Sequence, residues 1–242
     1  MNTKTLSVAT LIATAAASAT SASAMTVQIR DLAGSGETSL GATPGIYLAG
    51  TGGRYNGMVA GQSGDLPAGT YELEIDQLAG DGWELFLTYC IEPEQLLDVP
   101  PPVGTSYETA QLIDNGFTAT EVVYAQRLWA GAFAMSQTSA VNAAAFQAIL
   151  WELSEDDDQD LSAGNHKING LANTFTNDVL NTAQGWLDAI VSGDWFEEEA
   201  LVALVSDDSQ DLLIPADALV PAPGALALAG VAGLVATRRR RA

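Results

Sequence analysis

The chain has 242 residues and a formal net charge of −21 at pH 7. Its 30 acidic residues all lie within residues 25–219. A surface with this much negative charge repels phosphate groups. The composition therefore excludes nucleic acid as a partner. The five Trp residues lie in the same part and indicate a folded core rather than a disordered stalk. The basic residues of this part are Arg30, Arg54, Arg127 and Lys167.

The first 24 residues have the pattern of a secretory signal. Lys4 precedes an uncharged run of apolar and small residues at 6–19, and Ala22 and Ala24 supply the small side chains of a cleavage site. An amphipathic helix is the alternative, but the run has no polar face. We therefore expect residues 1–24 to be a signal peptide that is cleaved after Ala24.

Residues 25–99 read as a β-rich region. Apolar and polar residues alternate at 25–29 and 71–75, and glycine-rich turns are expected at 34–36, 50–53 and 80–82. Residues 83–91 form a more continuous apolar run, which predicts a buried central strand that carries Cys90. Prolines at 93 and 100–102 end this region and suggest a subdomain boundary.

Residues 118–195 read as mainly helical. Apolar residues recur at helical spacing in 118–153, which predicts two packed helices, and a third amphipathic segment follows at 177–192. Closing strands are expected in 200–215, at 201–205 and 211–214. Residues 25–219 therefore predict one exported α+β domain, with a sandwich- or barrel-like β part and a helical insertion.

The last residues, 220–242, have the layout of a sorting or anchor tail. Pro221 and Pro223 precede an uncharged apolar run at 225–236, which is shorter than the roughly 20 residues of an ordinary membrane span. The terminal arginines would stay in the cytoplasm, so the preceding chain would lie outside. These arginines are Arg238, Arg239, Arg240 and Arg241.

This layout resembles the PEP-CTERM sorting signal, although Ala222 stands where that family usually has an acidic residue. The resemblance implies recognition by an exosortase-type sorting enzyme and at least a transient transmembrane helix in the inner membrane. The mature protein would then lie in the cell envelope, at the cell surface or in an extracellular matrix. An ordinary permanent anchor is the alternative.

Cys90 is the only cysteine, in a compartment where cysteines usually pair as disulfides. Four interpretations stay open: an inert buried thiol, an intermolecular disulfide, a catalytic nucleophile, or another covalent partner within the chain.

Two short segments resemble the paired signatures of the thioester domains of bacterial surface adhesins. The first is Tyr89, Cys90 and Ile91, and the second runs from Phe146 and Gln147 to Trp151 and Glu152. The resemblance implies a thioester between Cys90 and Gln147 that would acylate an amine or a hydroxyl of a surface or matrix partner. Such a protein is a single-use attachment protein for adhesion rather than an enzyme. The alternative is a buried thiol and a core glutamine in a non-covalent matrix protein.

Two further candidates come from the polar segment that follows the second helix. His166 with Cys90 and Asp160 would suit a Cys-dependent hydrolase, although a loop histidine is more often solvated. Asp156, Asp158 and Asp160 have the alternate spacing of a weak Ca²⁺ loop but lack its glycine and its final glutamate, so a solvated charge cluster is the default. The sequence has no phosphate loop, CxxC pair or HExxH motif, and we expect no firmly bound cofactor.

Overall fold

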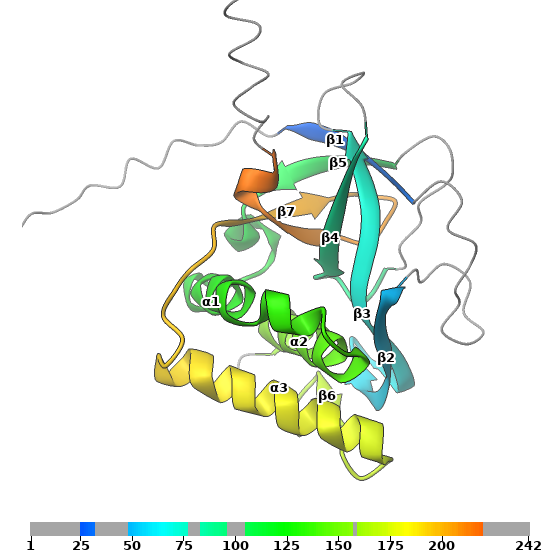
Figure 1. Ribbon diagram of the computed structural model, residues 1–242, viewed down its shortest axis with the longest axis vertical. Helices are drawn as coiled ribbons and strands as arrows, with labels where there is room; N and C mark the ends of the chain where they lie inside the picture. The colour runs from blue at the N-terminus through cyan, green and yellow to red at the C-terminus, as the bar shows by residue number, and fades with distance from the viewer. Residues whose placement is uncertain (1–24, 32–47, 77–82, 96–104, 157–158, 220–242) are drawn as a thin grey trace, which may run out of the picture.

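The computed structural model describes residues 25–31, 48–76, 83–95, 105–156 and 159–219 (Figure 1). The predicted signal peptide, with Ala22 and Ala24, lies outside the described residues. The predicted tail, with Pro221, Pro223 and the four terminal arginines, also lies outside them. Within the described part, an antiparallel sheet packs against α-helices, which confirms the predicted α+β fold class.

The sheet closes on itself. Strands pair in the order β1-β5-β7-β8-β4-β3, and β3 pairs back with β1, so these six strands form an antiparallel ring. Closure removes the open edges that a flat sheet would expose. The strands of the ring are β1 (Thr26–Asp31), β3 (Gln62–Asp76), β4 (Glu84–Cys90), β5 (Thr105–Ala110), β7 (Leu201–Val205) and β8 (Leu212–Pro215).

Alternation of side chains explains why the ring has a dry interior. Along β3, Tyr71, Leu73 and Ile75 are buried, whereas the glutamates between them are partly exposed. Successive side chains of a strand point to opposite faces, so the predicted pattern of one wet and one dry face is confirmed here.

Strands β2 (Leu48–Val59) and β6 (Lys167–Ile168) extend the sheet beyond the ring. The first half of β3 pairs with β2 through a two-residue turn at Ala60 and Gly61, both of which have positive φ. The glycine-rich turn expected at 50–53 is wrong, because these residues belong to β2. Gly57 permits the close approach of β6, since a Cβ at this position would meet the carbonyl oxygen of Lys167.

Three α-helices in the described part lie between β5 and β7, and each begins with a polar N-cap side chain. Thr118 and Glu121 form a reciprocal capping box, and Ser139 and Asn173 each accept a backbone N–H of the first turn. The helices are α1 (Ala119–Ser136), α2 (Ala140–Glu155) and α3 (Thr174–Ser192), and two 3₁₀ turns, Leu112–Asn115 and Ala216–Leu219, flank β5 and β8.

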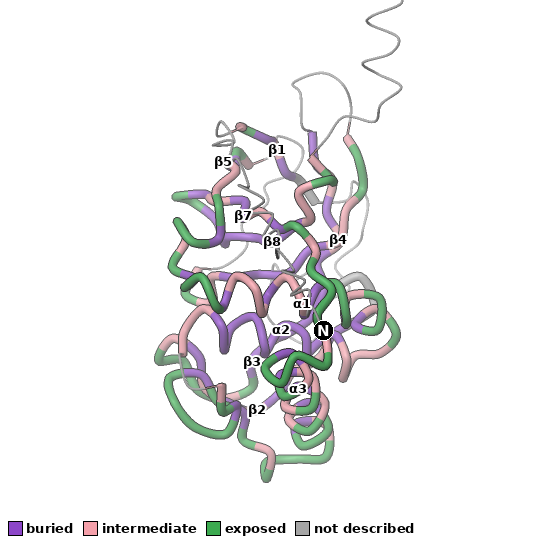
Figure 2. The backbone as a smooth tube through the Cα atoms, turned by 90° about the vertical axis from the view of Figure 1, so that its left-hand side faces the viewer, coloured by how far each residue is buried: buried purple, intermediate pink, exposed green. Residues whose placement is uncertain are grey.

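Helix α2 is the centre of the helical layer. All its residues from 143 to 153 are buried, which Figure 2 shows as an almost continuous buried segment. The helix packs against α1, α3, β2 and β3. Its Ala-rich surface allows these close approaches, because small side chains let neighbouring elements come near.

Two further expectations need correction. The suggested boundary near residue 100 is wrong, because β5, β7 and β8 join the same sheet as β3 and β4. The strand at 83–91 is only half buried: its last residues are enclosed, but Leu85 is exposed.

A membrane-spanning helix is not found among the described residues, since none of the helices there is sufficiently long and apolar.

Candidate functional site

The structure brings Cys90 and Gln147 into direct contact. Cys90 is the last residue of β4, and Gln147 projects from the middle of α2. The backbone N–H of Cys90 donates to Oε1 of Gln147 at 3.2 Å, and Nε2 of Gln147 donates to the carbonyl oxygen of Cys90 at 2.6 Å. The carboxamide of Gln147 therefore takes the place of a neighbouring strand at the end of β4.

The thiol of Cys90 is enclosed as well. Its S–H donates to the carbonyl oxygen of Glu92 at 3.2 Å, and the indole N–H of Trp151 donates to Sγ at 3.4 Å. The exposed fractions are 0% for Cys90, 1% for Gln147 and 5% for Trp151, so water has little access to the contact. Burial raises the pKa of the Cys90 thiol well above its usual value, and the carboxylates of Glu92 and Asp211 add to the rise.

The residues that flank Cys90 and Gln147 in sequence pack against each other. The rings of Tyr89 and Phe146 stack with centroids 4.3 Å apart. The phenol of Tyr89 donates to Ser136 at 2.7 Å and accepts from Thr70 at 2.8 Å, and burial raises its pKa to about 12. Ile91 is also buried. The strand-to-helix contact is therefore held by an aromatic pair on one side and by Trp151 on the other.

A second buried group lies behind Trp151. Nδ1 of His166 lies 2.9 Å from the carboxylate of Glu152, and Nε2 lies 2.8 Å from the phenol of Tyr55. Burial lowers the pKa of His166 to about 3, so this histidine is neutral at pH 7. A carboxylate only accepts, so Nδ1–H donates to Glu152, and Nε2 accepts from Tyr55. The rings of Tyr55 and His166 each lie 6.4 Å from that of Trp151.

The expectation of a solvated histidine is therefore wrong. His166 is fully buried, and its ring nitrogens contact Glu152 and Tyr55, neither of them a member of the suggested hydrolase triad. The carboxylate of Asp160 instead binds the backbone and hydroxyl of Ser162 in its own loop. Sequence reasoning missed Tyr55 because nothing in β2 distinguishes it from other core aromatics.

The aspartates suggested as a Ca²⁺ loop point to different partners. Asp156 accepts the backbone N–H of His166 at 2.7 Å, and this contact fixes the loop that carries the histidine. Asp158 lies outside the described residues. Among the residues that the structure describes, no group of three or more metal-ligating side chains could hold a metal ion.

Two carboxylates, those of Glu92 and Asp211, act on the Cys90 thiol. Glu92 follows Cys90 closely, and a carboxylate oxygen of Glu92 accepts the backbone N–H of Asp211 at 3.4 Å. Partial burial raises the pKa values of Glu92, Glu155 and Asp211, and nearby carboxylates raise them further. The local potential is therefore negative, which favours the approach of a cation.

The described chain is thus an α+β protein with a closed antiparallel sheet and an enclosed cysteine–glutamine contact. The sequence matches no protein-family model, and no curated protein matches it. Among solved structures, it is similar to the N-terminal thioester domain of a surface protein from Clostridium perfringens. That similarity has a TM-score of 0.36 and 11% identity, and it covers 66% of this chain and 95% of the other.

Proposed function

We propose that the protein is an exported attachment protein whose Cys90 and Gln147 form an internal thioester. In the forming step, Sγ of Cys90 bonds to the side-chain carbonyl carbon of Gln147, the C–N bond breaks, and the amide nitrogen leaves as ammonia with the thiol proton. A nucleophile of a partner then attacks the same carbon. The C–S bond breaks, the Cys90 thiol is restored, and the partner is held covalently on residue 147.

The observation that carries this proposal is the double hydrogen bond between Gln147 and the backbone of Cys90. A carboxamide is a poor electrophile, so reaction with a thiol requires both groups to be held in close and fixed geometry. Two hydrogen bonds from one side chain to one residue restrict the carboxamide strongly, and burial on α2 and β4 restricts its neighbours. The adjacent residues Tyr89 and Phe146 stack and keep the two elements in register.

Trp151 has the position of a cover for the reactive bond. Its indole N–H points at Sγ, and its ring packs beside Tyr55 and His166. The hydrogen-bonded chain from Tyr55 through His166 to Glu152 fixes these rings, because both ring nitrogens of His166 have a partner within it. We infer that this chain keeps water from the thioester by holding Trp151 in place.

We propose a primary amine as the partner group. The carboxylates of Glu92 and Asp211 lie near the Cys90 thiol, and they attract a lysine ammonium group more than a neutral hydroxyl. The ammonium must lose its proton before it attacks, and a carboxylate with a raised pKa is a better proton acceptor than an ordinary one. Glu92 and Asp211 each have both properties, and Glu92 lies closer to Cys90 in the sequence.

The cellular location is part of the same proposal. The predicted signal peptide at 1–24 and the predicted tail at 220–242 would place residues 25–219 outside the inner membrane, with the tail read by an exosortase-type sorting enzyme. One end of the chain would then hold it to the envelope, while residue 147 holds the partner.

The test is incorporation of a small tagged primary amine by the full chain under native conditions. We expect a tag on Gln147 and the appearance of a free Cys90 thiol, with a tagged alcohol reacting more slowly. Cys90→Ala keeps Gln147 but removes the nucleophile, so it should take up no tag. Absence of the tag from the unmodified chain, or equal tagging of Cys90→Ala, would refute the thioester and favour a non-covalent matrix protein.

A further inference from the structure

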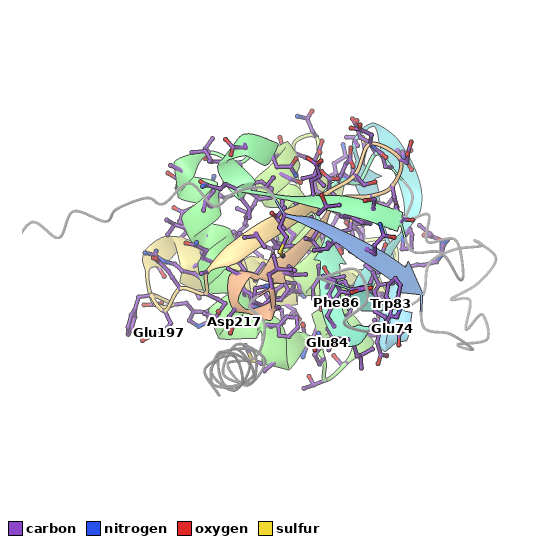
Figure 3. All side chains as sticks on the ribbon, turned by 90° about the horizontal axis from the view of Figure 1, so that it is seen from above. Glu74, Trp83, Glu84, Phe86, Glu197 and Asp217 are labelled. Carbon is purple, nitrogen blue, oxygen red and sulfur yellow. The ribbon has the colours of Figure 1, made fainter. Side chains whose placement is uncertain are left out.

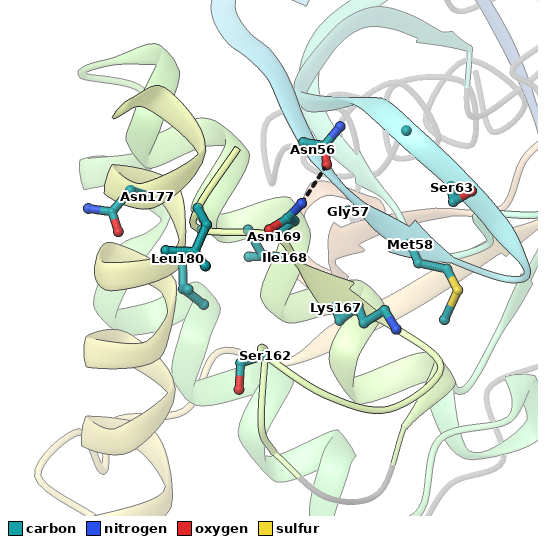
Figure 4. Close-up of a pocket in the computed structure, with 13 residues that line it drawn as sticks. Asn56, Gly57, Met58, Ser63, Ser162, Lys167, Ile168, Asn169, Asn177 and Leu180 are labelled. Carbon is teal, nitrogen blue, oxygen red and sulfur yellow. Dashed lines mark hydrogen bonds between the residues drawn. The ribbon is translucent and has the colours of Figure 1, made fainter. Parts of the chain in front are cut away.

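A pocket of about 790 Å³ lies between the β2–β6 ladder and the first turns of α3 (Figure 4). Its apolar wall includes Met58, Leu171 and Leu180. Asn56 and Asn169 lie in its centre, joined by a hydrogen bond of 3.1 Å between their side chains. The pocket is thus built from the β2–β3 hairpin, from residues 162 and 167–171 and from α3, and part of its wall is already fixed.

The charge of the pocket is unlike that of the rest of the protein. The described residues that line it include Lys167 but no carboxylate, although the chain carries 30 acidic and only 9 basic residues. Lys167 is exposed, and its ammonium group makes no ion pair within the described part of the chain. The pocket therefore suits a group that combines an apolar side chain with a carboxylate.

An apolar side chain next to a carboxylate projects from the segment that follows the C-terminal end of α3, whereas the pocket lies at the N-terminal end of this helix. Phe196 is 68% exposed, and Glu197 beside it is exposed and lies at the periphery of the molecule in Figure 3. Among the described residues, Leu171 at the pocket (98% exposed) and Phe196 are the two most exposed large apolar side chains. Exposed large apolar groups of this kind mark contact surfaces.

The projecting segment is held rigidly on both sides. Trp195 donates its backbone N–H to Ala189 at 3.1 Å, and its ring lies against Gly131 of α1, where a Cβ would clash. Glu198 pairs with Arg127 at 3.3 Å. Phe196 and Glu197 are therefore presented outward by anchored neighbours, which lowers the entropy lost when they bind.

We propose that Phe196 and Glu197 of one copy dock in the pocket of a second copy. Phe196 packs against Leu171 and Leu180, and the carboxylate of Glu197 pairs with Lys167. A helix rises about 1.5 Å per residue, so the fixed segment after Ser192 cannot reach the pocket at the start of the same α3. The contact joins two different surfaces, and a contact of this kind repeats into an open chain of copies unless its rotation closes a ring.

Charge reversal tests this pairing by sedimentation velocity of the full chain at increasing concentration. All variants carry Cys90→Ala, so that covalent links do not contribute. We expect association that rises with concentration, and on the order of tenfold weaker association for Lys167→Glu alone or Glu197→Lys alone, because like charges then face each other. An equimolar mixture of these two variants restores opposite charges at every contact and should restore association.

Glu108→Lys makes the same change of charge as Glu197→Lys, at an exposed position of β5 away from both surfaces, and should leave association unchanged or slightly stronger. A chain that stays monomeric at every concentration would overturn the proposal. So would reversals without effect, or a mixture that associates no better than its components.

Discussion

The two faces of the β2–β6 ladder differ sharply although their residues alternate along the same strands. Tyr55 and His166 face inward, where they are buried and hydrogen-bonded to each other beside Trp151. Their neighbours Asn56 and Lys167 line an open pocket. The inner face satisfies its polar groups and excludes water, which suits a reactive bond that must last. The outer face keeps a charged group available, which suits a reversible contact.

The largest expected effect comes from a substitution in the buried aromatic cluster beside Cys90 and Gln147. Phe146→Ala removes a ring that is fully buried and stacked on Tyr89, and we expect a loss of about 3–5 kcal/mol in the free energy of unfolding. Urea unfolding measures it. Phe196→Ala removes the same ring from an exposed site and is the matched control. Equal losses for the two variants would show that the aromatic cluster does not hold the core.

The next effect is a pH dependence carried by His166. Its folded pKa is about 3, below the usual 6.5, so the unfolded chain binds the proton first and stability falls as pH falls from about 6.5 toward 3. His166→Gln should be less stable at pH 7, and its deficit should shrink by up to about 1.4 kcal/mol per pH unit in this window. Urea unfolding at several pH values measures the difference in stability between the two chains. The raised pKa values of Glu92, Glu155 and Asp211 affect both chains alike and cancel in this difference. A constant deficit would contradict a neutral buried histidine.

A smaller effect is expected at the cover of the thiol. Trp151→Phe keeps a ring but removes the N–H that reaches Sγ, and one hydrogen bond contributes about 1 kcal/mol. We expect about fivefold faster hydrolysis of the thioester, followed as the appearance of free thiol with time. Trp186→Phe on α3 is the control. An unchanged hydrolysis rate would argue against a shielding role for Trp151.

The smallest effect on stability is expected at the pocket that Lys167 lines. Lys167→Met should change the free energy of unfolding by no more than about 0.5 kcal/mol, because its ammonium group has no ion pair within the described residues. Thermal unfolding checks this. A loss of several kcal/mol would mean that Lys167 is part of the fold rather than of a contact surface.

Much of the fold was predictable from periodicity. The alternation at 71–75 and the helical spacing in 118–153 identified β3, α1 and α2, because burial of one face imposes these patterns directly. The glycines of β2 led to the wrong prediction of a turn at 50–53. Glycine is typical of turns, but it also occurs where two strands approach closely, as Gly57 does with β6. The sequence gives no sign that β3 pairs with β1 to close the ring, since this is a long-range pairing.

The candidate site was also predicted only in part. Cys90 and Gln147 were suggested by two short motifs, and the structure puts them in contact although they lie 57 residues apart. Tyr55 and His166 were not predicted as a pair, because they lie 111 residues apart and neither belongs to a motif. Whether the Cys90–Gln147 bond forms stays a prediction.

The intact mass of the purified full chain under denaturing, non-reducing conditions tests that bond most directly. We expect the chain to be lighter than its own sequence mass by one ammonia, and we expect Cys90 not to react with an alkylating reagent. Cys90→Ala should have its full sequence mass. A full-mass chain with a freely alkylated Cys90 would contradict the thioester and with it the covalent attachment proposed here.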